Sequence, residues 1–183
     1  MSALSILYLV LPLPFAFIIH DAEEIAVQHR WITQHEIKLK ARFHWIGHII
    51  DRLKRLSTTA FAIAALEELL IILAATANVL TDGFLSAEIW VAIFIAFSLH
   101  LIVHIIQALI VKAYTPGVVS SILLLPYAYY GLLSISLVKS PCEIAALGAI
   151  GVTFMIVNLL FAHWLGLKIK KNCKTWSELR LLP

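Results

Sequence analysis

Charged residues are scarce in this chain. Only 14% of its 183 residues are Asp, Glu, Lys or Arg, against roughly a quarter in soluble domains, and 61% are hydrophobic. This deficit excludes an ordinary soluble domain, and the length leaves no room for a separate soluble catalytic domain beside a set of spanning helices. Any function must therefore lie inside or at the surface of a membrane-embedded bundle.

Cysteines and repeats are also few or missing. The two cysteines, Cys142 and Cys173, are expected on opposite sides of the membrane, which excludes a disulfide between them. No internal repeat or strand pattern is visible. The Lys and Arg residues do not intermingle with aromatic residues and suit anionic lipid headgroups, so we predict membrane lipid and no nucleic acid as a partner.

Long apolar runs are abundant, and they predict an all-α fold. We expect a polytopic membrane helix bundle with about five transmembrane helices and a short amphipathic helix on the cytoplasmic side. The whole chain, 1–183, forms one membrane domain, in which a basic cytoplasmic connection and a basic cytoplasmic tail occupy residues 28–57 and 168–183. The spans are expected at about residues 3–27, 58–80, 88–111, 118–138 and 143–167.

The positive charges predict an orientation. With five spans, 13 of the 14 Lys and Arg residues lie on one side of the membrane, and only Lys139 lies opposite. Cytoplasmic loops carry the excess of Lys and Arg, so we expect the N-terminus outside and the C-terminus in the cytoplasm. The expected location is the inner (plasma) membrane of a cell, which the chain crosses several times.

One polar motif, residues 20–24, follows the first apolar run and places an imidazole beside three carboxyl groups. A charged carboxylate at the bilayer centre costs on the order of 2.5 to 3.5 kcal/mol, so such groups need a counter-charge, a metal ion or water. Helical neighbours three or four residues apart share a face. His20 can therefore converge with either Glu23 or Glu24.

Further histidines and glutamates lie at a similar depth in three other predicted spans, all in the cytoplasmic half of the bilayer. Imidazoles combined with carboxylates bind zinc or iron, and helix bundles hold such ions between facing helices. We therefore predict zinc or iron as the cofactor, in a mononuclear or dinuclear site. The predicted ligands are His20, Glu24, Glu67, His100, His104 and His163.

Several of these residues also have simpler interpretations. A lone histidine such as His163 is more often a satisfied core residue than a ligand. Glu67 and Glu68 are adjacent and point about 100° apart, so one of the two is expected to face away from the site. We predict supporting rather than ligating roles for three residues, Glu68, Gln107 and Asn158.

The motif at residues 20–24, His104 followed by a Tyr-Thr-Pro-Gly turn at 114–117, and His163 in the last predicted span resemble one family. This is the HXXEE-motif family of small bacterial integral membrane proteins, and the resemblance covers roughly residues 10–167. It implies a metal-dependent membrane enzyme. The residues that it implicates are His20, Glu23, Glu24, His104 and His163, whereas depth and spacing alone implicate Glu67, Glu68 and His100.

These observations favour a metal-dependent enzyme, a hydrolase rather than an oxygenase. Glu23 is the predicted general base on a water that the metal ion activates. A site in the inner leaflet that opens sideways between helices suits a lipid or another amphipathic substrate.

Two other functions stay open. The same His and Glu residues can form the path of a proton or metal-ion transporter, in which Pro12 and Pro14 mark a broken helix at the binding site. Against this, no half of the chain repeats the other, and no polar residues continue through the outer leaflet. A structural subunit is the third alternative. Gly148 and Gly151 permit close helix contacts, which leaves a homo-oligomer open.

Overall fold

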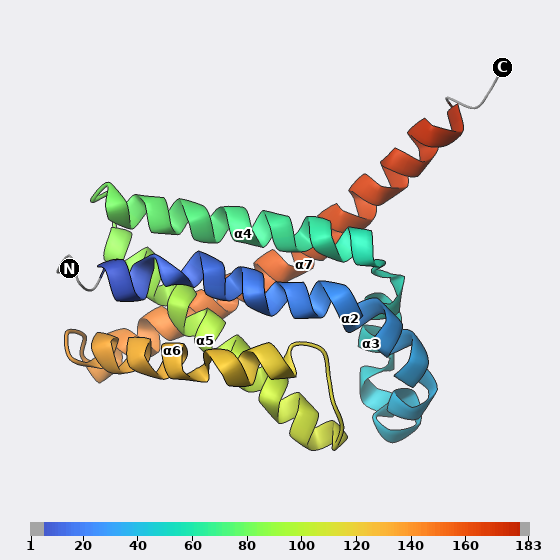
Figure 1. Ribbon diagram of the computed structural model, residues 1–183, viewed down its shortest axis with the longest axis horizontal. Helices are drawn as coiled ribbons and strands as arrows, with labels where there is room; N and C mark the ends of the chain where they lie inside the picture. The colour runs from blue at the N-terminus through green and yellow to red at the C-terminus, as the bar shows by residue number, and fades with distance from the viewer. Residues whose placement is uncertain (1–5, 180–183) are drawn as a thin grey trace.

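The structure, a computed structural model, describes residues 6–179, with side chains described for residues 8–172. This part of the chain is helical and contains no strand, which confirms the all-α fold. The predictions that concern the Cys173 side chain, residues 1–5 and residues 180–183 lie outside what is described. The long helices run roughly lengthwise through the molecule, and a short helix packs at one end (Figure 1).

The chain enters the bundle through a π-helical turn, crosses it in long helices, and turns twice near the basic end. In order, the elements are η1 (Ile6–Val10), α2 (Pro12–Arg42), the 3₁₀ turn η2 (His44–Ile46), α3 (Gly47–Arg55), α4 (Thr58–Leu80), α5 (Ser86–Val111), α6 (Val118–Ser136) and α7 (Pro141–Leu179).

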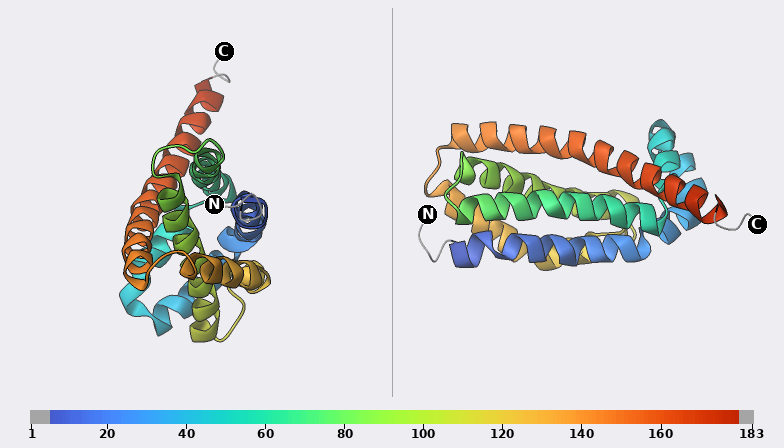
Figure 2. Two further views of the ribbon diagram at one scale, coloured as in Figure 1. Left: turned by 90° about the vertical axis from the view of Figure 1, so that its left-hand side faces the viewer. Right: turned by 90° about the horizontal axis from the view of Figure 1, so that it is seen from above.

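Four of the described helices are long and apolar enough to cross a membrane. They are Thr58–Leu80, Ser86–Val111, Val118–Ser136 and Pro141–Asn172. The first predicted span corresponds to α2, which is not among the four because it carries the three acidic side chains of residues 21–24. This helix packs at the edge of the bundle, beside α4 and α6 (Figures 1 and 2), and it leaves Phe15, Ile18 and Ile19 exposed.

Two helices run on beyond their predicted ends. Helix α2 continues through residues 28–42, which were expected to be part of a connection, because no glycine or proline interrupts the sequence after Pro14. Helix α7 likewise continues into the basic tail as far as Leu179 and projects beyond the bundle (Figure 2). Much of the basic segment is therefore helix rather than loop.

Pro12 and Pro14 start α2 instead of breaking it. Both lie in the first turn, where a missing N–H group costs no helical hydrogen bond. The irregular backbone precedes them in η1, where the Leu9 carbonyl accepts a hydrogen bond of 2.6 Å from the Tyr127 hydroxyl of α6. Helix α2 is continuous from there to His20.

Close packing fixes α7 against its neighbours. A Cβ atom on Gly151 would collide with the carbonyl of Ala92 in α5, and one on Gly166 would collide with the carbonyl of Ala60 in α4. Gly151, which was expected to permit a close helix contact either within the chain or with a second copy, thus makes that contact within the bundle. Trp90 lies fully buried nearby, in the apolar core between α5 and its neighbours.

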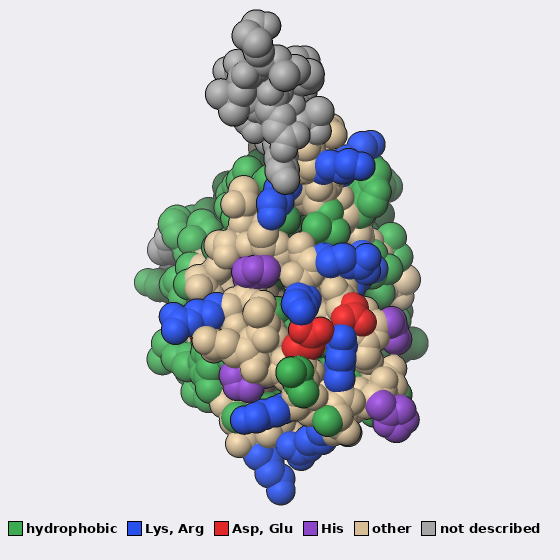
Figure 3. Space-filling model, turned by 90° about the vertical axis from the view of Figure 1, so that its right-hand side faces the viewer, with side chains coloured by type: hydrophobic (Ala, Val, Ile, Leu, Met, Phe, Trp, Pro, Cys, Tyr) green, Lys and Arg blue, Asp and Glu red, His purple; other side chains and the backbone are tan. Residues whose placement is uncertain are grey.

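The basic end of the molecule is built by α3 folding back on α2. Ile50 of α3 is 2% exposed and packs against Ile32 and Leu39 of α2. Lys54 of α3 and Lys40 of α2 both donate to Glu36, at 2.5 and 2.8 Å. Lys and Arg side chains gather around this small acidic patch in Figure 3, as expected for a surface that meets anionic lipid headgroups.

Candidate metal centre

Helices α2 and α5 bring two histidine-containing pairs face to face. His20 and Glu24 are four residues apart on α2, and His100 and His104 are four residues apart on α5, so each pair shares one helical face. The ligand atoms of all four side chains lie within 4.8 Å of one another. His20 is fully buried, and His104 and Glu24 are 6% and 9% exposed.

Hydrogen bonds determine which nitrogen of His20 carries its proton. His20 Nδ1 lies 3.0 Å from the Ser120 hydroxyl of α6. That hydroxyl has one proton, which it gives to the carboxylate of Glu23 at 2.6 Å or the carbonyl of Gly117 at 3.2 Å. Ser120 must therefore accept from His20 Nδ1–H, which leaves a lone pair on Nε2. His20 Nε2 is buried without a hydrogen-bond partner among the described residues.

The same reasoning applies to His104. Its Nδ1 lies 2.9 Å from the carbonyl of Pro116, which can only accept, so Nδ1 is protonated and Nε2 is bare. His104 Nε2 accepts a hydrogen bond of 3.0 Å from His100 Nε2–H, and it lies 3.5 Å from a carboxylate oxygen of Glu24. The unprotonated Nε2 atoms of His20 and His104 are thus both directed into the same buried group of side chains.

The turn between α5 and α6 packs against both imidazoles. Gly117 has φ +82°, a backbone conformation that favours glycine. A Cβ atom there would lie 2.8 Å from His104 Nδ1 and 3.0 Å from Cε1 of His20. Only a residue without a side chain lets this turn approach the two rings so closely.

Glu23 faces away from the four-residue group and binds the start of α6. Its carboxylate accepts from the backbone N–H groups of Ser120 at 2.7 Å and Val119 at 3.4 Å, where the helix N-terminus favours negative charge. It also accepts from the Tyr114 hydroxyl at 2.8 Å. Burial raises the pKa of Tyr114 to about 12, and the bond to Glu23 acts in the same direction, so Tyr114 stays a donor at neutral pH.

Negative charge accumulates around Glu24. The carboxyl groups of Asp21, Glu23 and Glu68 all lie close enough to repel it. Asp21 is itself 7% exposed. Buried carboxylates in such numbers need protons or a cation to neutralise them.

The donor set fits a zinc or iron ion. Imidazole nitrogens bind zinc at about 2.0–2.1 Å, and a tetrahedral arrangement then separates neighbouring ligand atoms by roughly 3.3 Å. The ligand atoms of the four residues lie within 4.8 Å of one another, so they would have to approach by at most about 1.5 Å to reach that spacing. The fixed tautomers of His20 and His104 resemble the usual arrangement, in which the second ring nitrogen of a ligating histidine donates to a neighbouring group.

Comparison with family models gives one match, over residues 11–131, described as a protein of unknown function with HXXEE motif. The chain belongs to the HXXEE family. Comparison with curated proteins finds no match, and neither does comparison with solved structures. In the HXXEE motif of this chain, His20 and Glu24 enter the candidate metal centre, while Glu23 reaches across to α6.

Two of the predicted ligands lie outside the centre of this HXXEE protein. Glu67 accepts a hydrogen bond of 3.1 Å from the Asn158 amide, which joins α4 to α7. His163 of α7 packs on the ring of Phe61 at 6.0 Å, near Arg52. The structure therefore does not bring Glu67 or His163 to the other four residues.

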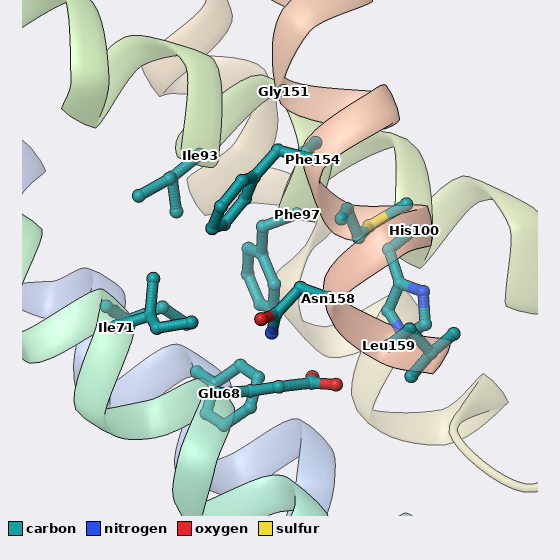
Figure 4. Close-up of a pocket in the computed structure, with 13 residues that line it drawn as sticks. Glu68, Ile71, Ile93, Phe97, His100, Gly151, Phe154, Asn158 and Leu159 are labelled. Atoms are coloured by element: carbon teal, nitrogen blue, oxygen red, sulfur yellow. The ribbon is translucent and has the colours of Figure 1, made fainter. Parts of the chain in front are cut away.

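The predicted supporting residues are divided between two environments. Gln107 is exposed on α5. Glu68 and Asn158 line a cavity together with His100, as Figure 4 shows. Of the pair Glu67 and Glu68, it is thus Glu68 that turns toward the candidate metal centre.

Sequence reasoning missed three residues that shape the centre. Tyr114 and Gly117 belong to the turn that carries the family resemblance, but nothing in their spacing assigns them contacts with Glu23 or the histidines. Ser120 has no recognisable signal at all, because serine is common at helix starts for other reasons.

Proposed function

We propose that this HXXEE protein is a metal-dependent hydrolase of a lipid or another amphipathic substrate, with its site in the cytoplasmic half of a bacterial inner membrane. The observation that carries the proposal is the pair of unprotonated Nε2 atoms on His20 and His104, of which that of His20 has no hydrogen-bond partner among the described residues. Hydrogen bonds orient both atoms into a buried group completed by His100 and Glu24.

The ion, zinc or iron, singly or as a pair, would supply Lewis acidity that polarises a carbonyl group and acidifies a water molecule. His20, His100, His104 and Glu24 would hold it. For Glu23, the hydrogen bonds to α6 favour a positioning role through Ser120 and His20. Its predicted role as general base stays a prediction.

Two observations favour an enzyme over the alternative, a proton or metal-ion transporter. Beyond the histidines, toward the N-terminal ends of α2 and α5, the described interior is mostly apolar and holds no buried charged side chain. Leu13, Trp90 and Phe94 are fully buried there, and the buried polar side chains are the hydroxyls of Ser98 and Thr76. Helix α2 is also continuous at the site rather than broken. A conducting path needs polar groups on both sides of the centre.

Metal analysis tests the proposal. We expect about one or two equivalents of zinc or iron in the detergent-purified protein by plasma mass spectrometry, and none in a folded variant carrying His20→Ala, Glu24→Ala and His104→Ala. The matched control, His163→Ala, should keep its metal because His163 lies apart from the group. The proposal fails if the parent remains metal-free after loading and added metal does not raise its melting temperature.

A further inference from the structure

A cavity of about 80 Å³ adjoins the candidate metal centre between α4, α5 and α7 (Figure 4). Most of its lining is apolar, and its polar residues are Glu68, His100 and Asn158. Its volume is roughly half that of an engineered cavity that takes benzene. The space can therefore take one hydrocarbon chain rather than two, and only a short segment of that chain.

The polar residues lie together at one end of this cavity. On α5, His100 follows the lining residues Ile93 and Phe97, and on α7, Asn158 follows Phe154. Helix α4 runs in the opposite direction, and there Glu68 precedes its lining isoleucines. The cavity is thus polar toward the basic end of the bundle and apolar toward the other.

His100 joins the polar end to the metal centre, since its Nε2 lies 3.0 Å from the Nε2 of His104. Glu68 makes no hydrogen bond or ion pair with the described residues, and its carboxyl group points along the cavity toward His100 (Figure 4). Phe154, which lines the cavity, is 47% exposed. A molecule entering from the lipid past Phe154 would meet an apolar channel first and a polar, metal-binding end last.

We propose that this cavity holds a single hydrocarbon chain of a substrate whose carbonyl group lies at His100 and Glu68. The chain extends toward the bilayer centre, which matches an amphiphile from the cytoplasmic leaflet. In this arrangement Glu68, not Glu23, is the carboxyl group that faces the reacting carbonyl. The inference rests on the proposed metal site and adds the class and direction of its substrate.

Alkyl hydroxamic acids test it, because they join a metal-binding group to a chain of chosen length. We expect dissociation constants from titration calorimetry, in one fixed detergent, to fall with chain length from acetohydroxamic to butanohydroxamic acid and then to change little up to octanohydroxamic acid, because the cavity buries only a short segment. Burial of a methylene group is worth about a fourfold gain in affinity. Ala96→Leu, which fills the cavity, should weaken octanohydroxamic acid at least tenfold and leave acetohydroxamic acid unchanged.

A second substitution guards against misfolding of the first. Phe154→Ala widens the cavity, so it should shift the preference toward longer or branched chains, whereas Phe161→Ala, an exposed phenylalanine on the same helix, should not. An unchanged chain-length dependence in Ala96→Leu and Phe154→Ala would overturn the inference, while retained binding of acetohydroxamic acid would leave the metal site standing. If the parent protein binds neither metal nor hydroxamate, both the proposed metal site and the proposed substrate cavity are wrong.

Discussion

At the scale of single residues, the two adjacent glutamates of the HXXEE motif make different contacts. Glu24 lies with the histidines, and Glu23 holds the start of α6. Sequence spacing could not decide between them, because positions three and four residues after His20 share its helical face equally well. The decision depends on Ser120, which is 97 residues away from Glu23 along the chain.

The link from Glu23 through Ser120 to His20 gives a first prediction. Ser120→Ala removes the acceptor that fixes the His20 tautomer, so metal affinity should fall roughly 10- to 100-fold while the helical fold is kept. Competition with a chelator measures this affinity. Ser98→Ala is the matched control, since Ser98 is equally buried but donates only to Phe94 of its own helix. Equal affinities in the two variants would contradict the role given to Ser120.

At the scale of elements, the sequence predicted which segments form helices, but it did not predict how each helix is rotated about its own axis. Turn residues such as Gly83 and Pro141 mark where α4 and α7 end and begin, close to the predicted limits. When a helix is apolar on all sides, its sequence does not indicate which face packs against the neighbouring helices. For that reason the sequence could only mark His163 as the weaker ligand candidate, and it could not show that α7 turns this residue onto Phe61.

The contact between α2 and α3 gives a prediction about pH. Hydrogen bonds from Lys40 and Lys54 hold the pKa of Glu36 below its usual value of 4.5. The carboxylate thus stabilises this contact fully above pH 4.5, and the stabilisation is lost as the pH falls through the lower pKa of the folded state. Hydrogen exchange of α3, corrected for intrinsic rates, should show protection falling in that acid range.

Glu36→Gln should lower the protection of α3 at neutral pH and abolish its decline in acid. Parent-like protection in this variant at neutral pH would show that the apolar contacts of Ile50, rather than Glu36, hold α3 in place.

At the scale of the whole molecule, Lys and Arg side chains gather at one end of the bundle (Figure 3), whereas Lys139 lies at the other end in an ion pair with Glu88. Composition predicted this division and the helical class, because both follow from summed properties of many residues. The cavity beside His100 could not be predicted, because it depends on how the side chains of several helices leave space between them.

The proposed orientation predicts which cysteine is accessible from outside. With Cys173→Ser, the exposed Cys142 at the start of α7 should react with a membrane-impermeant maleimide in intact cells. With Cys142→Ser, labelling of Cys173 should require lysis. The reverse pattern would place the basic end outside and remove the assignment of the site to the cytoplasmic leaflet.

Helix α7 forms one wall of the cavity but supplies none of the four residues of the candidate metal centre. It also lies beyond residue 131, where the match to the HXXEE family ends. Reaction chemistry and substrate choice would then reside in separate stretches of the chain. Such a protein can acquire a new substrate preference through mutations in its last helix while its metal-binding residues stay unchanged. A chimera that exchanges only this helix would then have the substrate preference of the protein that donated the helix.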